Sequence, residues 1–391
     1  MSSCRLAIIA DDLSGALDTA APFAARGADA RVVISLEALA KTLDTWQGQL
    51  PEVIAVNTES RHLPADEAAS RVTEAVRLLK RAHPQQWFKK VDSTLRGQVV
   101  AECRALREAL SLPLLLAPAV PAQGRTVRDA EVWVDGQLLA GTVYQQDALS
   151  VPIMGPIDRA FAASGLPLER YRPGPGMQLP NEDCIADAAS DEELASLYER
   201  LVSTNDVRTL AGAAGLATAI AQRCFGSPNA SYRSLSGVTS LLYAVGSRSP
   251  RAAEQLQQLC KNFPNVAVIE ACMDVPANDY ALSTCVVVPG AEVGRTASEV
   301  AKAMAAQVAA ITFTWNGIEE SLLFLTGGDI AMAVLSRQGV SYISVEAEWS
   351  PGVALGVMDG DWRRRVITKA GGFGDQQLLV RLQQQLGLQR E

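Results

Sequence analysis

Residues 6–15 read LAIIADDLSG, and this stretch indicates the fold class. The apolar run from Leu6 to Ala10 has the length of a buried β-strand. Asp11 and Asp12 follow at once, and Leu13 to Arg26 then has the pattern of an alanine-rich helix. A buried strand that passes through a polar turn into a helix is the repeating unit of parallel α/β sheets.

The same alternation of strands and helices continues to about residue 224. Strand-like segments lie at 31–35, 53–57, 87–92 and 113–117, and helical segments at 64–82, 191–202 and 215–224. Residues 124–172 are more polar and carry several turn signals. The first part of the chain is therefore predicted to form a mostly parallel sheet covered by helices.

A polar, turn-rich stretch at 226–237, GSPNASYRSLSG, is the candidate linker. After it the alternation starts again, with strand-like segments at 241–245, 266–269, 285–288, 322–325, 342–345 and 365–368 and helical segments at 250–260, 296–311, 330–337 and 376–386. A chain of 391 residues also exceeds what one hydrophobic core usually holds. We therefore predict two α/β domains, 1–228 and 238–391, with mostly parallel sheets.

Composition excludes several classes of protein. The net charge of −8 argues against a nucleic-acid binder, which usually has a basic face. No apolar run is long enough to span a membrane, and none of the seven cysteines stands in a CxxC pair. We expect a cytoplasmic protein with reduced thiols. The two histidines, His62 and His83, are not at a metal-ligand spacing, so a general base is expected to be Asp, Glu or Lys.

The first candidate site follows the strands of the N-terminal half. In open α/β sheets, ligands bind at the carboxyl ends of strands, where Asp12 could hold a substrate hydroxyl. Asp12 could equally be the N-cap of the next helix, which is a structural role. Arg61, in the segment TESR after the third strand, could bind a carboxylate, although a surface arginine is the commoner reading for that segment alone.

Residues 89–97, KKVDSTLRG, gather cations, an acid and hydroxyls at one strand end. Lys90 and Arg96 could bind a carboxylate, Lys as a point charge and Arg through two parallel hydrogen bonds. Asp92 and Ser93 could bond hydroxyl groups. A solvated basic turn is the alternative, but this mixture of residue types favours a binding site.

Three glycine-rich turns follow strands in the C-terminal half. They read GSRS at 246–249, TGGD at 326–329 and KAGGFG at 369–374. Glycines let a backbone approach a ligand closely, and helix N-termini offer free N–H groups to phosphate. The three together indicate a nucleotide. No GxxxxGK[ST] loop is present, so the chain is not a P-loop enzyme, and no convincing GxGxxG indicates a dehydrogenase. Asp329 would suit ribose or Mg²⁺, and Asp375 is expected to be a helix cap.

The order of these motifs resembles the four-carbon acid sugar kinases, a group once known only as a domain of unknown function. The segments that carry the resemblance are ADDLSGALD, TESR, KKVDSTLRG, APAVPAQGR, AAGLATAIA, GSRS, LTGGD and TKAGGFG. They run from about Ile8 to the final helix. The resemblance implies an N-terminal substrate domain and a C-terminal nucleotide domain with an active-site cleft between them. It also implies ATP-dependent phosphorylation of D-threonate, D-erythronate or a 3-oxo-tetronate at the terminal hydroxyl.

The resemblance also implies roles for individual positions. Those expected to bind the sugar acid are Asp12, Arg61, Lys90, Val91, Asp92, Ser93 and Arg96; those expected to bind ATP are Ser247, Gly327, Gly328, Asp329, Gly371, Gly372 and Gly374. Asp92 or Asp12 would accept the proton of the attacking hydroxyl, with Asp92 preferred. Mg²⁺ would neutralise developing charge, and domain closure would exclude water.

Two positions depart from the family pattern. Ile330 stands where the family usually has threonine after the glycine pair, which removes a side-chain hydroxyl. Arg248 stands where cysteine is frequent. The predicted function is a D-threonate kinase, with a homodimer expected only as the commonest default. The alternatives are a D-erythronate or 3-oxo-tetronate kinase, a sugar-acid aldolase or isomerase without ATP, and a nucleotide-gated sensor.

Overall fold

The computed structural model describes residues 4–142, 144, 150–174, 176–228, 232–272, 283–290, 294–315 and 320–387. Contacts within the chain divide it into two compact units, Met1–Asn229 and Ala230–Glu391, which we name unit 1 and unit 2. The boundary falls inside the predicted linker, of which residues 229–231 lie outside the described residues. No described helix is both long and apolar enough to cross a membrane.

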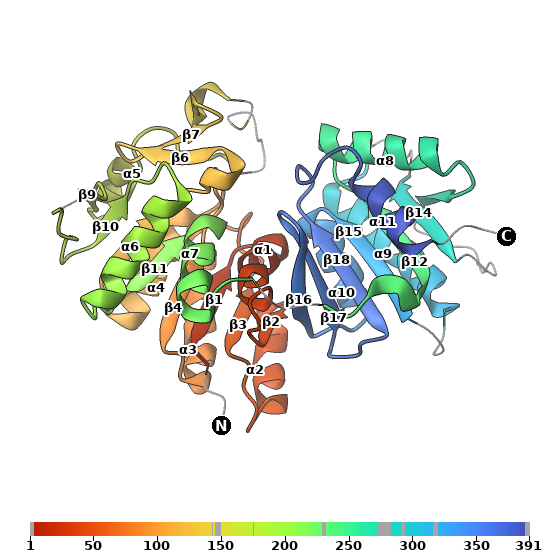
Figure 1. Cartoon of the computed structure of the whole chain (residues 1–391), viewed down its shortest axis with the longest axis horizontal. Coiled ribbons are helices and arrows are strands. Elements are labelled where there is room, and N and C mark those ends of the chain that lie inside the picture. The colour runs from red at the N-terminus through yellow and green to blue at the C-terminus, as the bar shows by residue number, and fades with distance from the viewer. Residues whose placement is uncertain are drawn as a thin grey trace. The chain divides into compact units, whose positions relative to one another are not determined.

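Unit 1 is built on a parallel sheet with the strand order β2-β3-β1-β4-β11-β5-β10-β9 (Figure 1). The strands are β1 (Leu6–Ala10), β2 (Ala30–Val33), β3 (Val53–Asn57), β4 (Gln86–Lys90), β5 (Leu114–Ala117), β9 (Glu169–Tyr171), β10 (Cys184–Ala186) and β11 (Thr209–Gly212). A separate antiparallel sheet contains β6 (Arg125–Arg128), β7 (Glu131–Val134) and β8 (Gln137–Leu138). It occupies part of the stretch that the sequence marks as polar and turn-rich.

The helices of unit 1 form two packed groups. They are α1 (Leu13–Ala24), α2 (Leu36–Thr45), α3 (Ala65–Leu79), α4 (Val99–Leu110), α5 (Ile157–Ala163), α6 (Asp191–Ser203) and α7 (Ala214–Phe225). Helix α1 packs on α7, which packs on α6, while α3 packs on α2 and α4. Right-handed crossovers place these two groups on opposite faces of the sheet, because α1 leads to a strand on one side of β1 and α3 to a strand on the other.

Unit 2 has a sheet with the order β13-β14-β12-β15-β18-β17-β16. Its strands are β12 (Val238–Val245), β13 (Ala267–Ala271), β14 (Thr284–Pro289), β15 (Glu320–Thr326), β16 (Tyr342–Ser350), β17 (Val353–Met358) and β18 (Arg364–Lys369). Its helices are α8 (Pro250–Asn262), α9 (Ala297–Phe313), α10 (Gly328–Arg337) and α11 (Leu378–Leu386). Strands β12 to β15 and β18 run parallel, whereas β17 pairs antiparallel with both β16 and β18.

One face of the unit 2 sheet holds a core of aromatic and aliphatic side chains. Tyr243 of β12 and Phe324 of β15 are fully buried there, with ring centroids 5.6 Å apart. Ile367 of β18 and Leu382 of α11 belong to the same cluster. Helix α11 packs on α8 over this face, and α9 packs on α10. The predicted α/β class with mostly parallel strands is confirmed.

Candidate functional site

Three strands of unit 1 end at the same level of the sheet. Ala10, the last residue of β1, pairs with Asn57 of β3 on one side and with Lys90 of β4 on the other. The segments 11–12, 58–61 and 91–97 therefore leave the sheet side by side. Helix α1 leads away from β1 to one side, and α3 leads across β1 to the other. Such a divergence of connections is where open α/β sheets bind ligands.

Arg61 joins two of these segments by binding both aspartates that follow β1. Its Nε lies 2.7 Å from Asp11 Oδ2 and its Nη2 lies 3.0 Å from Asp11 Oδ1, while Nη1 lies 2.8 Å from Asp12 Oδ2. Burial alone would raise the pKa of Asp11, but the charges of Arg61, Lys89 and Lys90 hold this pKa below its ordinary value. Arg61 is therefore a paired, mostly buried arginine and not a surface one.

Asp12 has the capping role that the sequence allows. It is the N-cap of α1, and its Oδ1 accepts a hydrogen bond of 2.8 Å from the backbone N–H of Gly15. A Cβ added at Gly15 would lie 2.5 Å from that oxygen, so this turn has no room for a side chain. The other carboxylate oxygen binds Arg61. Asp12 therefore caps the helix and also belongs to the cluster of charged side chains at the strand ends.

Asp92 lies in the turn after β4 and is 8% exposed, and Arg96 forms a bidentate ion pair with its carboxylate. The Nε of Arg96 lies 3.0 Å from Oδ2 and its Nη2 lies 3.0 Å from Oδ1. Thr94 donates to Oδ2 through its backbone N–H, at 3.1 Å, and through its hydroxyl. Burial would raise the pKa of Asp92, but the charge and hydrogen bonds of Arg96, with Arg61 and Lys90, hold it well below its ordinary value. Asp92 is therefore a carboxylate at neutral pH.

Lys90 points its ammonium at the start of α1. A Cβ added at Gly15 would lie 3.4 Å from Lys90 Nζ, which donates one hydrogen bond of 3.0 Å to the carbonyl of Val91. No ion pair of Lys90 occurs in the described part of the chain. Ser93 is partly exposed, and its hydroxyl makes no hydrogen bond to another described residue. Lys90 and Ser93 thus have donors left for a ligand, whereas the Val91 side chain is buried.

A second, deeper cluster lies behind these residues, and the sequence does not predict it. Lys89 Nζ lies 3.1 Å from Glu102 Oε2, and the side chains are 0% and 2% exposed. Ser60 donates to the other oxygen of Glu102, and Thr58 Oγ1 lies 2.7 Å from Ser60 Oγ. Burial raises the pKa of Glu102, and the charge of Lys89 offsets only part of this shift. This cluster joins β4, the turn after β3 and α4.

The three glycine-rich turns of unit 2 also leave one edge of a sheet. Thr326 of β15 pairs with Val245 of β12 on one side and with Lys369 of β18 on the other. Each of these residues ends its strand, and the predicted turns lie at these three strand ends. Ser249 Oγ donates to the carbonyl of Gly371 at 2.7 Å, and the N–H of Gly327 donates to the carbonyl of Lys369 at 3.2 Å. The structure brings the three turns together.

Packing explains several of the glycines in these turns. A Cβ added at Gly371 would lie 1.9 Å from Ser247 Oγ, whereas one at Gly372 would meet nothing within 4 Å. Gly327 has a φ of +100°, which favours glycine, and Gly328 begins α10. A Cβ at Gly374 would lie 2.8 Å from Leu378. The sequence therefore needs glycine at 371 and 374 to let the turns pack closely.

The two departures from the family pattern and two acids lie in or beside these turns. Ile330 is buried and fills the space beside Gly246, where an added Cβ would lie 2.4 Å from its Cγ1. Asp329 and Arg248 are both exposed. Asp375 accepts hydrogen bonds of 2.8 Å from the N–H of Gln377 and from Arg381, but the N-cap of α11 is Gln377, so the prediction that Asp375 caps this helix is wrong. Among the described residues, no group of three or more His, Cys, Asp or Glu is arranged to hold a metal ion.

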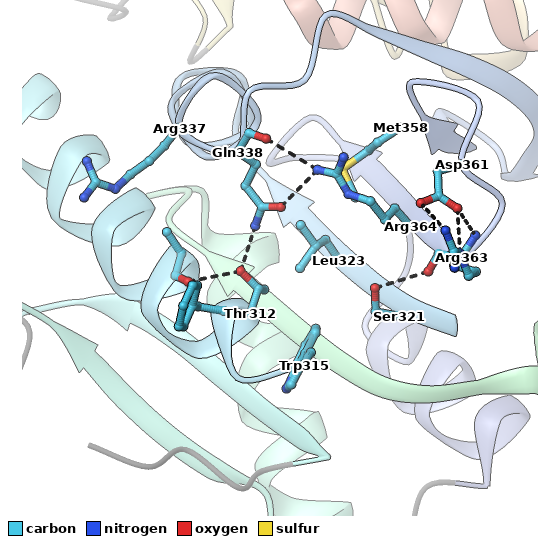
Figure 2. Close-up of a pocket in the computed structure, with 12 residues that line it drawn as sticks. Thr312, Trp315, Ser321, Leu323, Arg337, Gln338, Met358, Asp361, Arg363 and Arg364 are labelled. Atoms are coloured by element: carbon cyan, nitrogen blue, oxygen red, sulfur yellow. Dashed lines mark hydrogen bonds and ion pairs between the residues drawn. The ribbon is translucent and has the colours of Figure 1, made fainter. Parts of the chain in front are cut away.

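A cavity of about 370 Å³ lies at the opposite edge of the unit 2 sheet (Figure 2). Ser321 and Arg364, from the start of β15 and β18, line it together with Trp315 and Arg337. Arg364 lies 3.4 Å from Gln338 Oε1, and Arg363 lies 3.1 Å from Asp361 Oδ1. The glycine-rich turns follow the other ends of these strands. The cavity therefore contains none of the predicted site residues.

Comparison with known proteins matches both units to named families. Residues 6–220 match a sugar-binding N-terminal domain, and residues 287–379 match a nucleotide-binding C-terminal domain. The first match lies within unit 1 and contains the strand ends around Arg61 and Asp92. The second lies within unit 2 and contains the turns that begin at Thr326 and Lys369.

Full-length relatives carry a consistent name. A D-threonate kinase of Cupriavidus necator is 30% identical, with 95% of each chain covered, and a D-threonate kinase of Bordetella bronchiseptica is 31% identical, with 98% of each covered. A D-erythronate kinase of Heliobacterium modesticaldum is 34% identical, but the match covers 36% of this chain and 30% of that one.

Solved structures share the fold. A Haemophilus influenzae protein of the family DUF1537 has a TM-score of 0.72 at 18% identity, with 97% of this chain and 100% of that chain covered. A Bordetella bronchiseptica protein of the same family, a domain-swapped dimer with bound citrate, has a TM-score of 0.52 at 26% identity, with 99% of each chain covered. The chain thus has the fold of DUF1537 proteins.

Proposed function

Since this chain belongs to the four-carbon acid sugar kinase family, we propose that it transfers the γ-phosphate of ATP to the terminal 4-hydroxyl of D-threonate and releases 4-phospho-D-threonate. Membership makes it a phosphotransferase that acts on a hydroxyl group and uses ATP. The substrate is the proposed part. The observation that carries it is that both D-threonate kinases match over nearly their whole length, whereas the D-erythronate kinase matches over 36% of this chain.

We propose that the strand ends of unit 1 bind the sugar acid. Its carboxylate would lie against the ammonium of Lys90, which faces the positive N-terminal end of α1 and has donors to spare. Arg61 adds a second positive charge nearby but is already paired with Asp11 and Asp12. Hydroxyl groups of the sugar acid would bond to Asp12, Asp92 and Ser93. Val91 would contribute backbone contacts, and Arg96 would hold Asp92 in place.

Asp92 is our proposed acceptor for the proton of the attacking hydroxyl, with Asp12 as the alternative. Its low pKa makes it a weak base but keeps it charged, so it can orient the hydroxyl from the start of the reaction. In phosphoryl transfer, bond formation to the nucleophile lags, and positioning contributes more than proton removal. Asp92→Asn should lower kcat by about 100-fold or more, the usual worth of a positioned base. Turnover near the wild-type rate would show that Asp92 is not the acceptor.

ATP would bind at the three turns of unit 2. The positions concerned are Ser247, Gly327, Gly328, Asp329, Gly371, Gly372 and Gly374. Backbone N–H groups at the starts of α8 and α10 suit phosphate oxygens. Asp329 is the one acid among residues 246–249, 326–329 and 369–374, and one carboxylate together with phosphate oxygens is a common way to hold Mg²⁺. Bound Mg²⁺ would neutralise charge on the phosphates.

A panel of four-carbon acids tests the substrate. ADP release would be followed with D-threonate, D-erythronate and 3-oxo-tetronates, and ³¹P NMR would locate the phosphate in the product. We expect the highest kcat/KM with D-threonate and a phosphate on O4. A higher kcat/KM with D-erythronate would assign the chain to that substrate. If no acid stimulates ADP release although ATP binds, a nucleotide-gated sensor becomes the better explanation.

We also propose that the chain forms a homodimer. The domain-swapped dimer of the Bordetella bronchiseptica protein supports this assembly. Size-exclusion chromatography with light scattering would give the mass of the protein in solution. A mass equal to that of one chain, 41.6 kDa, across micromolar concentrations would contradict it.

A further inference from the structure

Lys369 is a buried cation for which the described residues provide no acid. It ends β18, it is 2% exposed, and its Nζ donates to the carbonyls of Ala370 at 3.1 Å and Gly371 at 2.9 Å. No carboxylate of the described residues forms an ion pair with it. An ammonium group has three N–H donors, so one is left over. A buried charge that is left uncompensated is costly, which indicates that its counter-charge comes from a ligand.

The surroundings of Lys369 are positive. Helix α8 begins at Pro250 and α10 at Gly328, and the N-terminal end of a helix carries a partial positive charge. Arg251, in the first turn of α8, adds a full positive charge. Burial and this charge together lower the pKa of Lys369 to about 8. The positive potential around Lys369 should attract an anion.

The other charged groups of these turns do not supply that anion. Arg248 is a further cation, and Asp329 is exposed on the first turn of α10. Asp375 is bound to Arg381, and Glu254 lies 3.0 Å from Arg251. None of these carboxylates forms an ion pair with Lys369.

Thr326 offers a second donor beside the ammonium. It is the residue of β15 that pairs with Lys369, and adjacent paired residues in a sheet point their side chains to the same face. That face also carries Phe324 and Ile367 and lies under α8 and α11. The hydroxyl of Thr326 is buried and has no hydrogen-bond partner among the described residues. A buried polar group without a partner is uncommon and calls for an explanation.

We infer that Lys369 binds the phosphate chain of the nucleotide, with the hydroxyl of Thr326 as a neighbouring donor. The inference rests on the proposed function of unit 2 as the ATP site. Phosphate oxygens would supply the missing counter-charge, and the ammonium would neutralise negative charge as the phosphoryl group leaves. The sequence alone gives Lys369 no role, because a lysine at a strand end beside glycines is common.

The competing explanation is that Lys369 only holds its own turn through Ala370 and Gly371. Calorimetric titration of Lys369→Met with ATP, ADP and adenosine separates the two. A phosphate ligand predicts that ATP and ADP bind about 10-fold to 100-fold more weakly, the worth of a charge-assisted hydrogen bond, while adenosine binds as to the wild type. A turn-holding role predicts equal weakening for all three. Lys261→Met, which removes an exposed lysine from α8, is the matched control and should bind all three normally.

Thr326→Val is a second test of the inference, which can be used if Lys369→Met does not fold. It removes a hydroxyl that has no partner among the described residues, so the fold should tolerate it, and ATP should bind more weakly with adenosine unchanged. The pH dependence gives a further readout. Phosphate favours the charged lysine, so ATP affinity of the wild type should fall as pH rises above about 8, and this fall should be missing in Lys369→Met.

Three outcomes overturn the inference on its own: ATP affinity unchanged in Lys369→Met, equal weakening of ATP, ADP and adenosine in that variant, or the same alkaline fall in both proteins. These measurements need no sugar acid. A wild type that binds ATP but phosphorylates no four-carbon acid would therefore refute the proposed function and leave the role of Lys369 standing. A wild type that binds no nucleotide would refute both.

Discussion

Lys89 and Glu102 form an ion pair in the interior of unit 1. The two charged atoms, Nζ and Oε2, lie 3.1 Å apart, and the side chains are 0% and 2% exposed. Lys89 precedes Lys90 in β4, and Ser60, which donates to Glu102, precedes Arg61. The pair therefore fixes the backbone of two residues on which the proposed sugar-acid site depends.

Replacing Glu102 with glutamine should destabilise the protein strongly. Glu102→Gln leaves Lys89 charged, buried and without its carboxylate, which typically costs about 3–5 kcal/mol. The new amide would still offer Ser60 a hydrogen-bond acceptor, but it carries no charge to balance the ammonium, so this bond should not rescue the loss. Urea unfolding of wild type and variant measures the difference.

The double variant Lys89→Met with Glu102→Leu is the informative comparison. Apolar residues in place of both partners often restore stability, because no charge remains to be buried. We therefore expect the double variant to be more stable than Glu102→Gln. Glu74→Gln, which removes the exposed partner of Arg77, should have no measurable effect. A Glu102→Gln protein as stable as the wild type would show that the pair contributes nothing.

Part of this cluster could have been found from the sequence. Consecutive residues of a strand point to opposite faces, so Lys89 and Lys90 cannot both face a ligand at the strand end. The family resemblance selects Lys90, and Lys89 must then point into the interior. Its partner could not be identified, because α4 is not among the predicted helices, and Glu102 stands there among the apolar residues Val99 and Cys103.

The predicted strand ends and turns are mostly right, because apolar runs that stop at Asp or Gly are strong local signals. Strands β6 to β11 and β17 are missed, since each of β6 to β11 is short and Val353–Met358 is apolar without alternation. The contacts of Arg61 could not be predicted. They join residues about 50 positions apart through the pairing of β1 with β3, which no local pattern contains.

Arg61→Lys should impair use of the sugar acid without affecting ATP. Lysine cannot reproduce the three hydrogen bonds of the guanidinium to Asp11 and Asp12. We expect kcat/KM for D-threonate to fall by about 100-fold, equivalent to two lost charge-assisted bonds, and the KM for ATP to change less than about twofold. Initial rates with each substrate varied in turn give both constants.

The control for this variant is Arg77→Lys. Arg77 also donates to a carboxylate through two nitrogens: its Nε and Nη2 each lie 2.6 Å from an oxygen of Glu74, on the exposed side of α3. Its replacement should leave both constants unchanged. Equal effects at 61 and 77 would mean that Arg61 acts through general stability alone.

Acid should destabilise unit 1 through Asp11 and Asp92. Both have a pKa below the ordinary value in the folded state, so their contribution is complete above the unfolded value of about 3.9 and is lost as pH falls below it. Asp92→Asn should unfold more easily at neutral pH but lose stability less steeply in acid, by up to about 1.4 kcal/mol per pH unit. Urea midpoints from about pH 5 down to about pH 2 begin above this window and extend well into it. Parallel curves for the two proteins would contradict it.

Gly371→Ala should disrupt the proposed ATP site. Gly372→Ala is the comparison, because it adds a methyl group that does not disturb the packing of the turns and can affect only a bound ligand. A Cβ at 371 would lie 1.9 Å from Ser247 Oγ and 2.9 Å from Ser247 Cβ, so the turns must move apart. We expect ATP to bind at least about 10-fold more weakly, since the loss of one charge-assisted phosphate contact suffices for that. A Cβ at 372 meets nothing within 4 Å, so thermal stability should stay at the wild-type value. If Gly372→Ala nevertheless weakens ATP binding, residue 372 lies against the nucleotide. Normal ATP binding in Gly371→Ala would remove the turn of β18 from the site.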